Sequence, residues 1–202
     1  MNCGKILLDD MSASGHRDRP VLHLDDVTWS YGGLETLSNR IARVLVEDLG
    51  LVPGNRVLLR AGNTPMLVAT WFGVIKAGGI CVATMQLLRA RELTYVIEKA
   101  QISHALCDLS LAKDLEDARH GTAGICRHLM FFSALGNDPS RCTLDSAIEN
   151  KSDDFMPCDT AADDTALIAF TSGTTGNPKA TMHFHRDVIA MSDCFPRYLD
   201  MA

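Results

Sequence analysis

The sequence predicts an α/β fold in which a mainly parallel sheet is flanked by helices. Short apolar runs alternate with longer stretches whose apolar residues recur every three or four positions, the patterns of buried strands and amphipathic helices. The apolar run Ala166–Phe170 also leads directly into a glycine-rich loop, and ligands bind beyond the carboxyl ends of strands in such sheets. Together these observations indicate a layered α/β structure.

Turn residues, helix-capping residues and the spacing of apolar residues predict where the individual helices and strands lie. A hairpin is expected over Pro20–Tyr31, and apolar residues at helical spacing predict a helix over Leu34–Leu45. Thr64 followed by proline predicts the capped first turn of a helix over Met66–Ala77. The other expected elements are strands at Arg56–Leu59, Ile80–Thr84, Ser103–Cys107, Leu129–Phe132, Ala166–Phe170 and Thr181–Phe184, and helices at Arg89–Ala100, Leu111–Ala118, Leu144–Glu149 and from about Asp187.

The domain organisation expected from these elements is a single α/β region over 1–202. Residues 151–164 are acidic and polar without apolar periodicity, so a surface crossing is expected there, before a phosphate-loop unit at 165–202. The apolar stretch Met66–Ile75, which Lys76 ends, is about half the ~20 residues that a membrane span needs. It therefore predicts a buried helix, and no membrane association is expected.

Charge and cysteine usage narrow the class of protein. With 25 acidic and 19 basic residues the net charge is −6, and no Lys/Arg cluster occurs, so no nucleic-acid partner is expected. The seven cysteines are scattered, without a C-x-x-C pair. That distribution argues against a disulfide framework or a zinc site and favours reduced thiols in the cytoplasm. No metal site is expected.

Residues 171–179 read Thr-Ser-Gly-Thr-Thr-Gly-Asn-Pro-Lys and carry the strongest functional signal. Glycines let the backbone approach a ligand closely, backbone N–H groups in such a turn can bind an anion, and Lys179 adds a positive charge for a phosphate oxygen. The spacing is not that of a Walker A loop, because Ala180 follows the lysine where Ser or Thr is required. An ordinary solvent-exposed loop is the alternative interpretation of a Ser/Thr/Gly/Pro cluster.

All nine residues match the phosphate-binding signature of the adenylate-forming superfamily, which includes acyl- and aryl-CoA synthetases, luciferases and peptide-synthetase adenylation domains. The likeness extends over nearly the whole chain. Phe72–Gly79 matches the family's "K-A-G" segment, although Gln86 stands where most members have a proline. The amino-acid sequences of residues 83–93 and 179–186 are most similar to the corresponding segments of benzoate- and 2-aminobenzoate-CoA ligases.

The resemblance implies an N-terminal part of an acyl-CoA synthetase large domain. The family's adenine- and Mg²⁺-binding motif, ribose-binding Asp and C-terminal catalytic Lys match nothing in residues 1–202, so the chain alone is expected to be inactive. The full enzyme would use ATP, Mg²⁺ and coenzyme A to activate a carboxylate, aromatic by the subfamily likeness. A stand-alone, non-catalytic nucleotide- or phosphate-binding or interaction domain is the alternative function.

The resemblance also implies roles for particular residues. Lys179 would be catalytic, and the ATP phosphates would be bound by Thr171, Ser172, Gly173, Thr174, Thr175, Gly176 and Lys179. His183 and His185 would share one face of a strand and lie near the acyl pocket. Apolar residues of the last helix, over Val188–Leu199, are expected to be exposed and to favour a homodimer.

Overall fold

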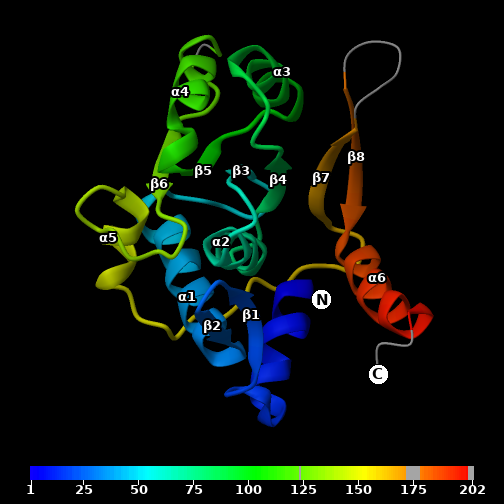
Figure 1. Cartoon of the computed structure of the whole chain (residues 1–202). Coiled ribbons are helices and arrows are strands. Elements are labelled where there is room, and N and C mark those ends of the chain that lie inside the picture. Colours follow the sequence, from blue (N-terminus) through cyan, green and yellow to red (C-terminus); the bar gives the residue numbers. More distant parts are fainter. Residues whose placement is uncertain (123, 172–177, 200–202) are drawn as a thin grey trace.

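The computed structural model, which describes residues 1–122, 124–171 and 178–199, contains a six-stranded sheet with helices on both faces (Figure 1). The strands are β1 (Pro20–Leu24), β2 (Val27–Ser30), β3 (Arg56–Arg60), β4 (Ile80–Thr84), β5 (His104–Asp108), β6 (His128–Phe132), β7 (Thr165–Thr171) and β8 (Lys179–Phe184). The α-helices are α1 (Tyr31–Arg43), α2 (Pro65–Lys76), α3 (Ala90–Ala100), α4 (Ala112–His120), α5 (Thr143–Glu149) and α6 (His185–Tyr198). Short helical turns cover Lys5–Asp9, Ser12–His16, Val44–Asp48 and Leu109–Leu111.

The sheet has the strand order β6-β5-β3-β4-β7-β8 and is parallel except for β8, which pairs antiparallel with β7 at the edge. The predicted α/β class with a mainly parallel sheet is therefore confirmed. β1 and β2 form the separate antiparallel hairpin that the sequence predicts.

Alternate residues of the central strand supply the two hydrophobic cores. Val57 and Leu59 of β3 pack with α1 and α2 on one face, while Leu58 packs with α3 and α4 on the other. The sequence of β3 contains a continuous apolar run because helices cover both faces of the strand. The helix start at α2 is also as predicted, because Thr64 Oγ1 accepts the Leu67 N–H at 3.3 Å.

The structure differs from the sequence-based expectations at several boundaries. The turns at Lys5–Asp9 and Ser12–His16 were not predicted. Cys3 and Leu8 are fully buried in the same core as residues of α1 and α2, and this packing holds the N-terminal segment in place. β8 begins at Lys179, two residues before the predicted strand, because its pairing with β7 extends to the loop. In β7 only Ala166 is fully buried and its neighbours are half-buried, so the prediction of a buried strand holds in part.

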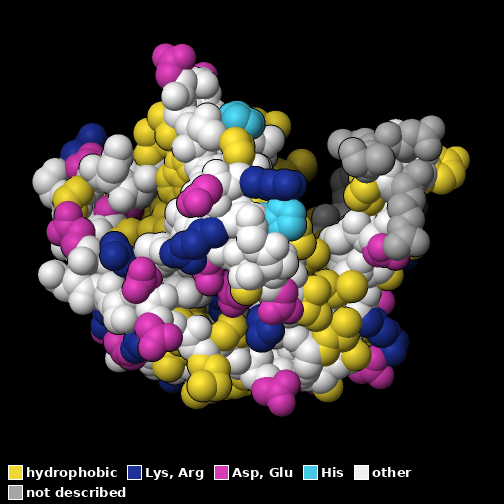
Figure 2. Space-filling view, turned by 90° about the horizontal axis from the view of Figure 1, so that it is seen from below, with side chains coloured by type: hydrophobic (Ala, Val, Ile, Leu, Met, Phe, Trp, Pro, Cys, Tyr) yellow, Lys and Arg dark blue, Asp and Glu magenta, His cyan; other side chains and the backbone are white. Residues whose placement is uncertain are grey.

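Acidic and basic side chains are interspersed over the face drawn in Figure 2, with apolar patches between them. In the part of the chain that the structure describes, the helices are all too short or too polar to cross a bilayer.

The seven free cysteines differ sharply in their surroundings, which gives a chemical test of the fold. Burial raises the pKa of Cys3 and of Cys107 to about 12 and that of Cys126 to about 11. Because the thiolate is the nucleophile, we expect iodoacetamide near neutral pH to modify exposed Cys194 first and these three thiols only after denaturation. Mass spectrometry of peptides identifies the alkylated sites. Fast modification of Cys107 in the native protein would contradict its burial in the core.

Candidate functional site

The ends of the predicted phosphate loop lie at the carboxyl edge of the parallel sheet. Thr171 ends β7 and Lys179 begins β8, and the two residues form the last cross-strand pair of the hairpin. Thr171 Oγ1 also donates to the Lys179 carbonyl oxygen at 3.4 Å. The hairpin therefore brings together the first and last residues of the predicted site.

The middle of the motif lies outside the described residues. This part comprises Ser172, Gly173, Thr174, Thr175 and Gly176, with Asn177. The two glycines and the lack of an apolar anchor in the sequence also predict that residues 172–178 are mobile without nucleotide. Because 172–177 lie outside the described residues, this stays a prediction. Lys179 is described, and it is exposed to solvent at the start of β8, where an ammonium group is accessible to a phosphate ligand.

A tyrosine from the neighbouring helix contacts the loop end of the hairpin. The Tyr95 hydroxyl of α3 donates to the Pro178 carbonyl oxygen at 3.1 Å. The Tyr95 ring also meets the Phe170 ring edge-to-face, with centroids 6.4 Å apart. Sequence reasoning missed Tyr95, because its place on an amphipathic helix gives no sign of a partner more than eighty positions away.

A buried arginine fixes the loop that follows β4 and contains Gln86. Arg60, at the end of β3, is 1% exposed, and its guanidinium donates to the carbonyl oxygens of Met85, Gln86 and Leu88 at 3.1, 3.2 and 2.8 Å. Burial lowers the pKa of Arg60 from its ordinary value, yet an arginine remains charged in proteins. The charge is therefore solvated by peptide carbonyls, and it anchors this loop at the same sheet edge as the phosphate loop.

The two histidines singled out in the sequence do not share a strand face. His183 lies in β8, with its Nε2 3.3 Å from Thr181 Oγ1, whereas His185 begins α6. His185 is 2% exposed, and its Nδ1 accepts the Cys3 N–H at 3.2 Å. Since β8 runs away from the loop, both histidines lie toward its far end, and their acyl-pocket role stays a prediction.

The tautomer of His185 follows from its surroundings. Burial lowers the pKa of His185, and Nδ1 acts as the acceptor, so the neutral ring carries its proton on Nε2. This arrangement is suited to packing the N-terminal segment against α6. Among residues 1–122, 124–171 and 178–199, no group of three or more His, Cys, Asp or Glu side chains is placed to hold a metal ion.

Comparisons with known proteins place these features in a family context. The model of the AMP-binding enzyme family matches residues 10–201. The 3-hydroxybenzoate–CoA ligase of Aromatoleum sp. (strain CIB) is 28% identical over 94% of this chain and 35% of its own length. The benzoate–CoA ligase of Thauera aromatica is also 28% identical, over 90% of this chain and 34% of its own length.

A solved structure shares the fold. The anthranilate CoA ligase AuaEII in complex with anthranoyl-AMP superposes with a TM-score of 0.85 at 21% identity, covering 96% of this chain and 36% of that chain. The chain thus spans about a third of the length of each of these proteins.

Proposed function

The chain belongs to the AMP-binding enzyme family, and on that premise we propose that it is the N-terminal, ATP-phosphate-binding part of an AMP-forming acid–CoA ligase. The observation that carries the proposal is the glycine-rich 171–179 segment, whose described ends lie at the carboxyl edge of the sheet with Lys179 exposed beside them. Ligands of open α/β sheets bind at this edge.

In the proposed reaction, a carboxylate oxygen of the acid attacks the α-phosphorus of ATP. The bond from that phosphorus to the bridging oxygen breaks, and pyrophosphate leaves with the developing negative charge. The coenzyme A thiol then attacks the acyl carbon, losing its proton, and AMP departs. The acid is already ionised at neutral pH, so the first step requires no general base from the chain.

The chain's contribution would be to bind the leaving phosphates. Thr171 and Lys179 fix the two ends of the loop, and the hydroxyl and N–H groups of 172–176 would surround the β- and γ-phosphates. Preorganised donors and cations aimed at developing charge are a major source of rate acceleration in such transfers. Mg²⁺ would enter with ATP, bound to its phosphate oxygens.

The proposed acid is aromatic, as in benzoate or 2-aminobenzoate. Support comes from the hydroxybenzoate– and benzoate–CoA ligases among the relatives. Acid-dependent exchange of labelled pyrophosphate into ATP by the longer enzyme tests both levels of the proposal. Exchange with an aliphatic acid but not with aromatic acids would overturn the substrate class alone, and no exchange with any acid would overturn the ligase proposal.

We propose a cytoplasmic location, consistent with the seven free thiols.

A stand-alone phosphate-binding domain is the alternative function. The same loop would support it, because phosphate binding needs only the hairpin ends and the 172–176 segment. The two functions differ in the length of the natural reading frame. A natural product of 202 residues that binds pyrophosphate would favour the alternative.

The chain on its own is expected to form no acyl-adenylate. Motifs that resemble the family's ribose-, adenine- and Mg²⁺-binding strings do not occur in residues 1–202, so ATP would be bound by its phosphates alone. Pyrophosphate release from ATP with benzoate or 2-aminobenzoate should therefore stay at the level without protein. Turnover that scales with protein concentration would contradict this expectation.

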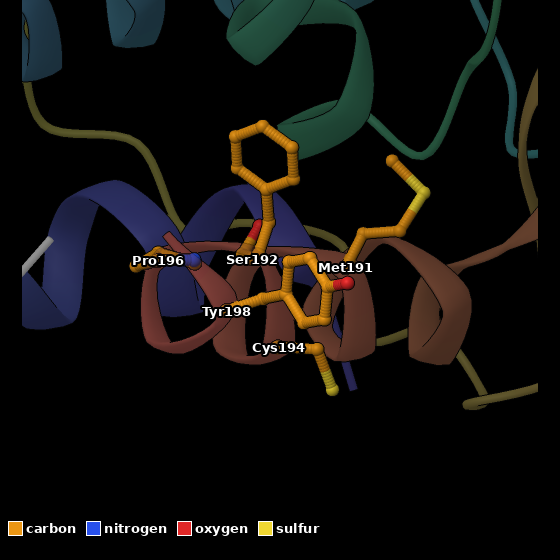
Figure 3. A pocket seen from close by; sticks show the side chains of 6 residues that line it. Met191, Ser192, Cys194, Pro196 and Tyr198 are labelled. Atoms are coloured by element: carbon orange, nitrogen blue, oxygen red, sulfur yellow. The ribbon is translucent and has the colours of Figure 1, made fainter. Parts of the chain in front are cut away.

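The exposed face of α6 is expected to make the chain self-associate. Figure 3 shows side chains of this helix that line a shallow hollow, among them Met191 and Tyr198. Met191, Phe195 and Tyr198 are 65%, 64% and 90% exposed, and contiguous apolar surface of this kind favours association. Sedimentation velocity should show a mass that rises with concentration.

Met191→Lys should shift this equilibrium toward monomer by placing a charge on the face. Met156→Lys is the matched control, because Met156 is also an exposed methionine, at 89%, but lies on the irregular segment before β7. A wild-type protein that stays monomeric over a wide concentration range would rule out the association.

A further inference from the structure

The loop end of the β7–β8 hairpin is separated from the point where the hairpin joins the sheet. The pairing of β7 with β4 is at Cys81↔Leu167, near the start of both strands, whereas the hairpin continues to Thr171↔Lys179. Figure 1 shows the hairpin standing apart from β4 toward the loop, with α3 on that side. Its loop end therefore needs a support other than the β4 pairing.

Tyr95 of α3 supplies such a support through two kinds of contact. Its ring packs edge-to-face on Phe170, which itself packs against the core formed by α3, α4 and the sheet. Its hydroxyl donates to the Pro178 carbonyl oxygen at 3.1 Å. The ring thus holds the end of β7, and the hydroxyl holds the residue that precedes β8.

The hydrogen bond acts on the peptide unit that leads into Lys179. The Pro178 carbonyl and the Lys179 N–H belong to one planar group, so fixing the carbonyl oxygen also orients the Lys179 N–H and Cα. Proline adds a fixed φ on the other side of that carbonyl. One phenolic hydroxyl therefore restricts both the position and the direction in which β8 begins.

The helix that carries Tyr95 is itself firmly placed. Leu93, Val96 and Ile97 of α3 are buried in the core. The helix start is closed by the Arg89 N–H, which donates to the Glu92 carboxylate at 3.0 Å. Arg60 holds the Leu88 carbonyl just before it. Tyr95 is therefore fixed to the body of the domain.

We propose that Tyr95 is a positioning residue that docks the loop end of the hairpin onto α3 and so places Lys179 for phosphate binding. This inference rests on the proposed function, since it assigns Lys179 a phosphate ligand. Tyr95 does not itself touch the ligand. It restricts the hairpin before the ligand arrives, which reduces the ordering cost of binding.

Tyr95→Phe in the 202-residue chain tests the proposal, because it keeps the ring on Phe170 and removes only the hydroxyl. Amide hydrogen exchange over residues 179–184 should accelerate about threefold to tenfold, the effect of one lost hydrogen bond. The dissociation constant for pyrophosphate, measured by calorimetry, should rise by a similar factor. Tyr31→Phe, in α1, is the matched control and should change neither quantity.

The outcomes separate the proposal from the function on which it rests. Unchanged exchange over 179–184 in Tyr95→Phe would overturn the docking, whatever the protein binds. Faster exchange with unchanged pyrophosphate affinity would show a purely structural contact and would overturn the positioning role. A wild-type chain that does not bind pyrophosphate would overturn the phosphate site, and the positioning role with it, while the exchange data would still report on the hydrogen bond.

Discussion

Lys179→Ala is expected to lower the adenylation rate of the proposed acid–CoA ligase by about 100-fold, comparable to the loss of one preorganised charge-stabilising donor. In the 202-residue chain, pyrophosphate affinity should fall by about tenfold or more, the effect of a lost charge-assisted hydrogen bond. The free energy of unfolding should hardly change, because the Lys179 side chain is exposed at the start of β8 and has little packing to lose. Calorimetry and urea denaturation measure the two quantities separately.

Lys113→Ala is the matched control for this substitution. Lys113 is a surface lysine of α4, 89% exposed and paired with Asp117 at 3.0 Å. Removing it changes the net charge equally but leaves the sheet edge untouched, so pyrophosphate affinity should stay within a factor of about two, as expected for a remote, screened surface charge. Equal losses in both variants would indicate a general charge effect, and no loss in Lys179→Ala would remove that residue from the site.

The parts of the fold that the sequence predicted are those governed by local rules. α2 begins where Thr64 and Pro65 place it, and its N-cap bond is present. The central strand β3 was expected at Arg56–Leu59 and ends one residue later, at Arg60. Such elements are predictable because capping, apolar runs and turn residues act over a few neighbouring positions.

The features that were missed depend on partners far along the chain. Arg60 gave no sequence sign of its burial, since the carbonyl groups that it binds are twenty-five or more positions away. Lys76 was expected simply to end an apolar helix, as basic residues often do, yet it is fully buried. In both cases a charged side chain is buried although its local sequence predicts exposure to solvent. Burial is possible because oxygen atoms from distant parts of the chain replace the water around the charge.

The same limit applies to the candidate site. The nine-residue motif predicted a phosphate-binding segment ending at Lys179, because close backbone approach and phosphate charge require particular residue types at fixed spacing. The structure pairs the two ends of that segment, Thr171 and Lys179, while the phosphate-binding role stays a prediction. Tyr95 could not be found in this way. Its contribution arises from the crossing of α3 over the sheet, which brings it to Pro178.

The second large effect is expected from Asp9→Ala, which should lower the free energy of unfolding by about 3–5 kcal/mol, the usual cost of breaking a buried ion pair from one side. The Lys76 ammonium is fully buried and lies 2.5 Å from Asp9 Oδ1. It also donates to Asn39 Oδ1 at 2.7 Å and Ser38 Oγ at 2.9 Å. Without Asp9 the charge would keep two neutral acceptors but lose the carboxylate paired with it, and only the weaker influence of the Glu35 carboxylate would remain. Urea denaturation near neutral pH measures the loss.

Lys76→Met and the double variant show whether the pair itself is responsible. Methionine fills a similar volume without a charge, and the remaining Asp9 carboxylate is 17% exposed, so Lys76→Met should cost less than Asp9→Ala. The double variant should then be more stable than Asp9→Ala alone, because the unpaired ammonium is gone. Additive losses would mean that the two side chains contribute independently.

The pH dependence of Asp9→Ala gives an independent check with a definite sign. Burial lowers the pKa of Lys76, and the Asp9 carboxylate opposes that shift, so removing Asp9 should lower the pKa further. A lysine whose folded pKa lies below its unfolded pKa binds protons more readily when unfolded, so stability falls as pH decreases. Asp9→Ala should therefore regain stability as the pH rises from neutrality toward the ordinary pKa of lysine, because the buried amine becomes neutral. The wild type, whose ammonium keeps its carboxylate, should change less over that range, and parallel curves for the two proteins would show that Asp9 does not stabilise the charge on Lys76.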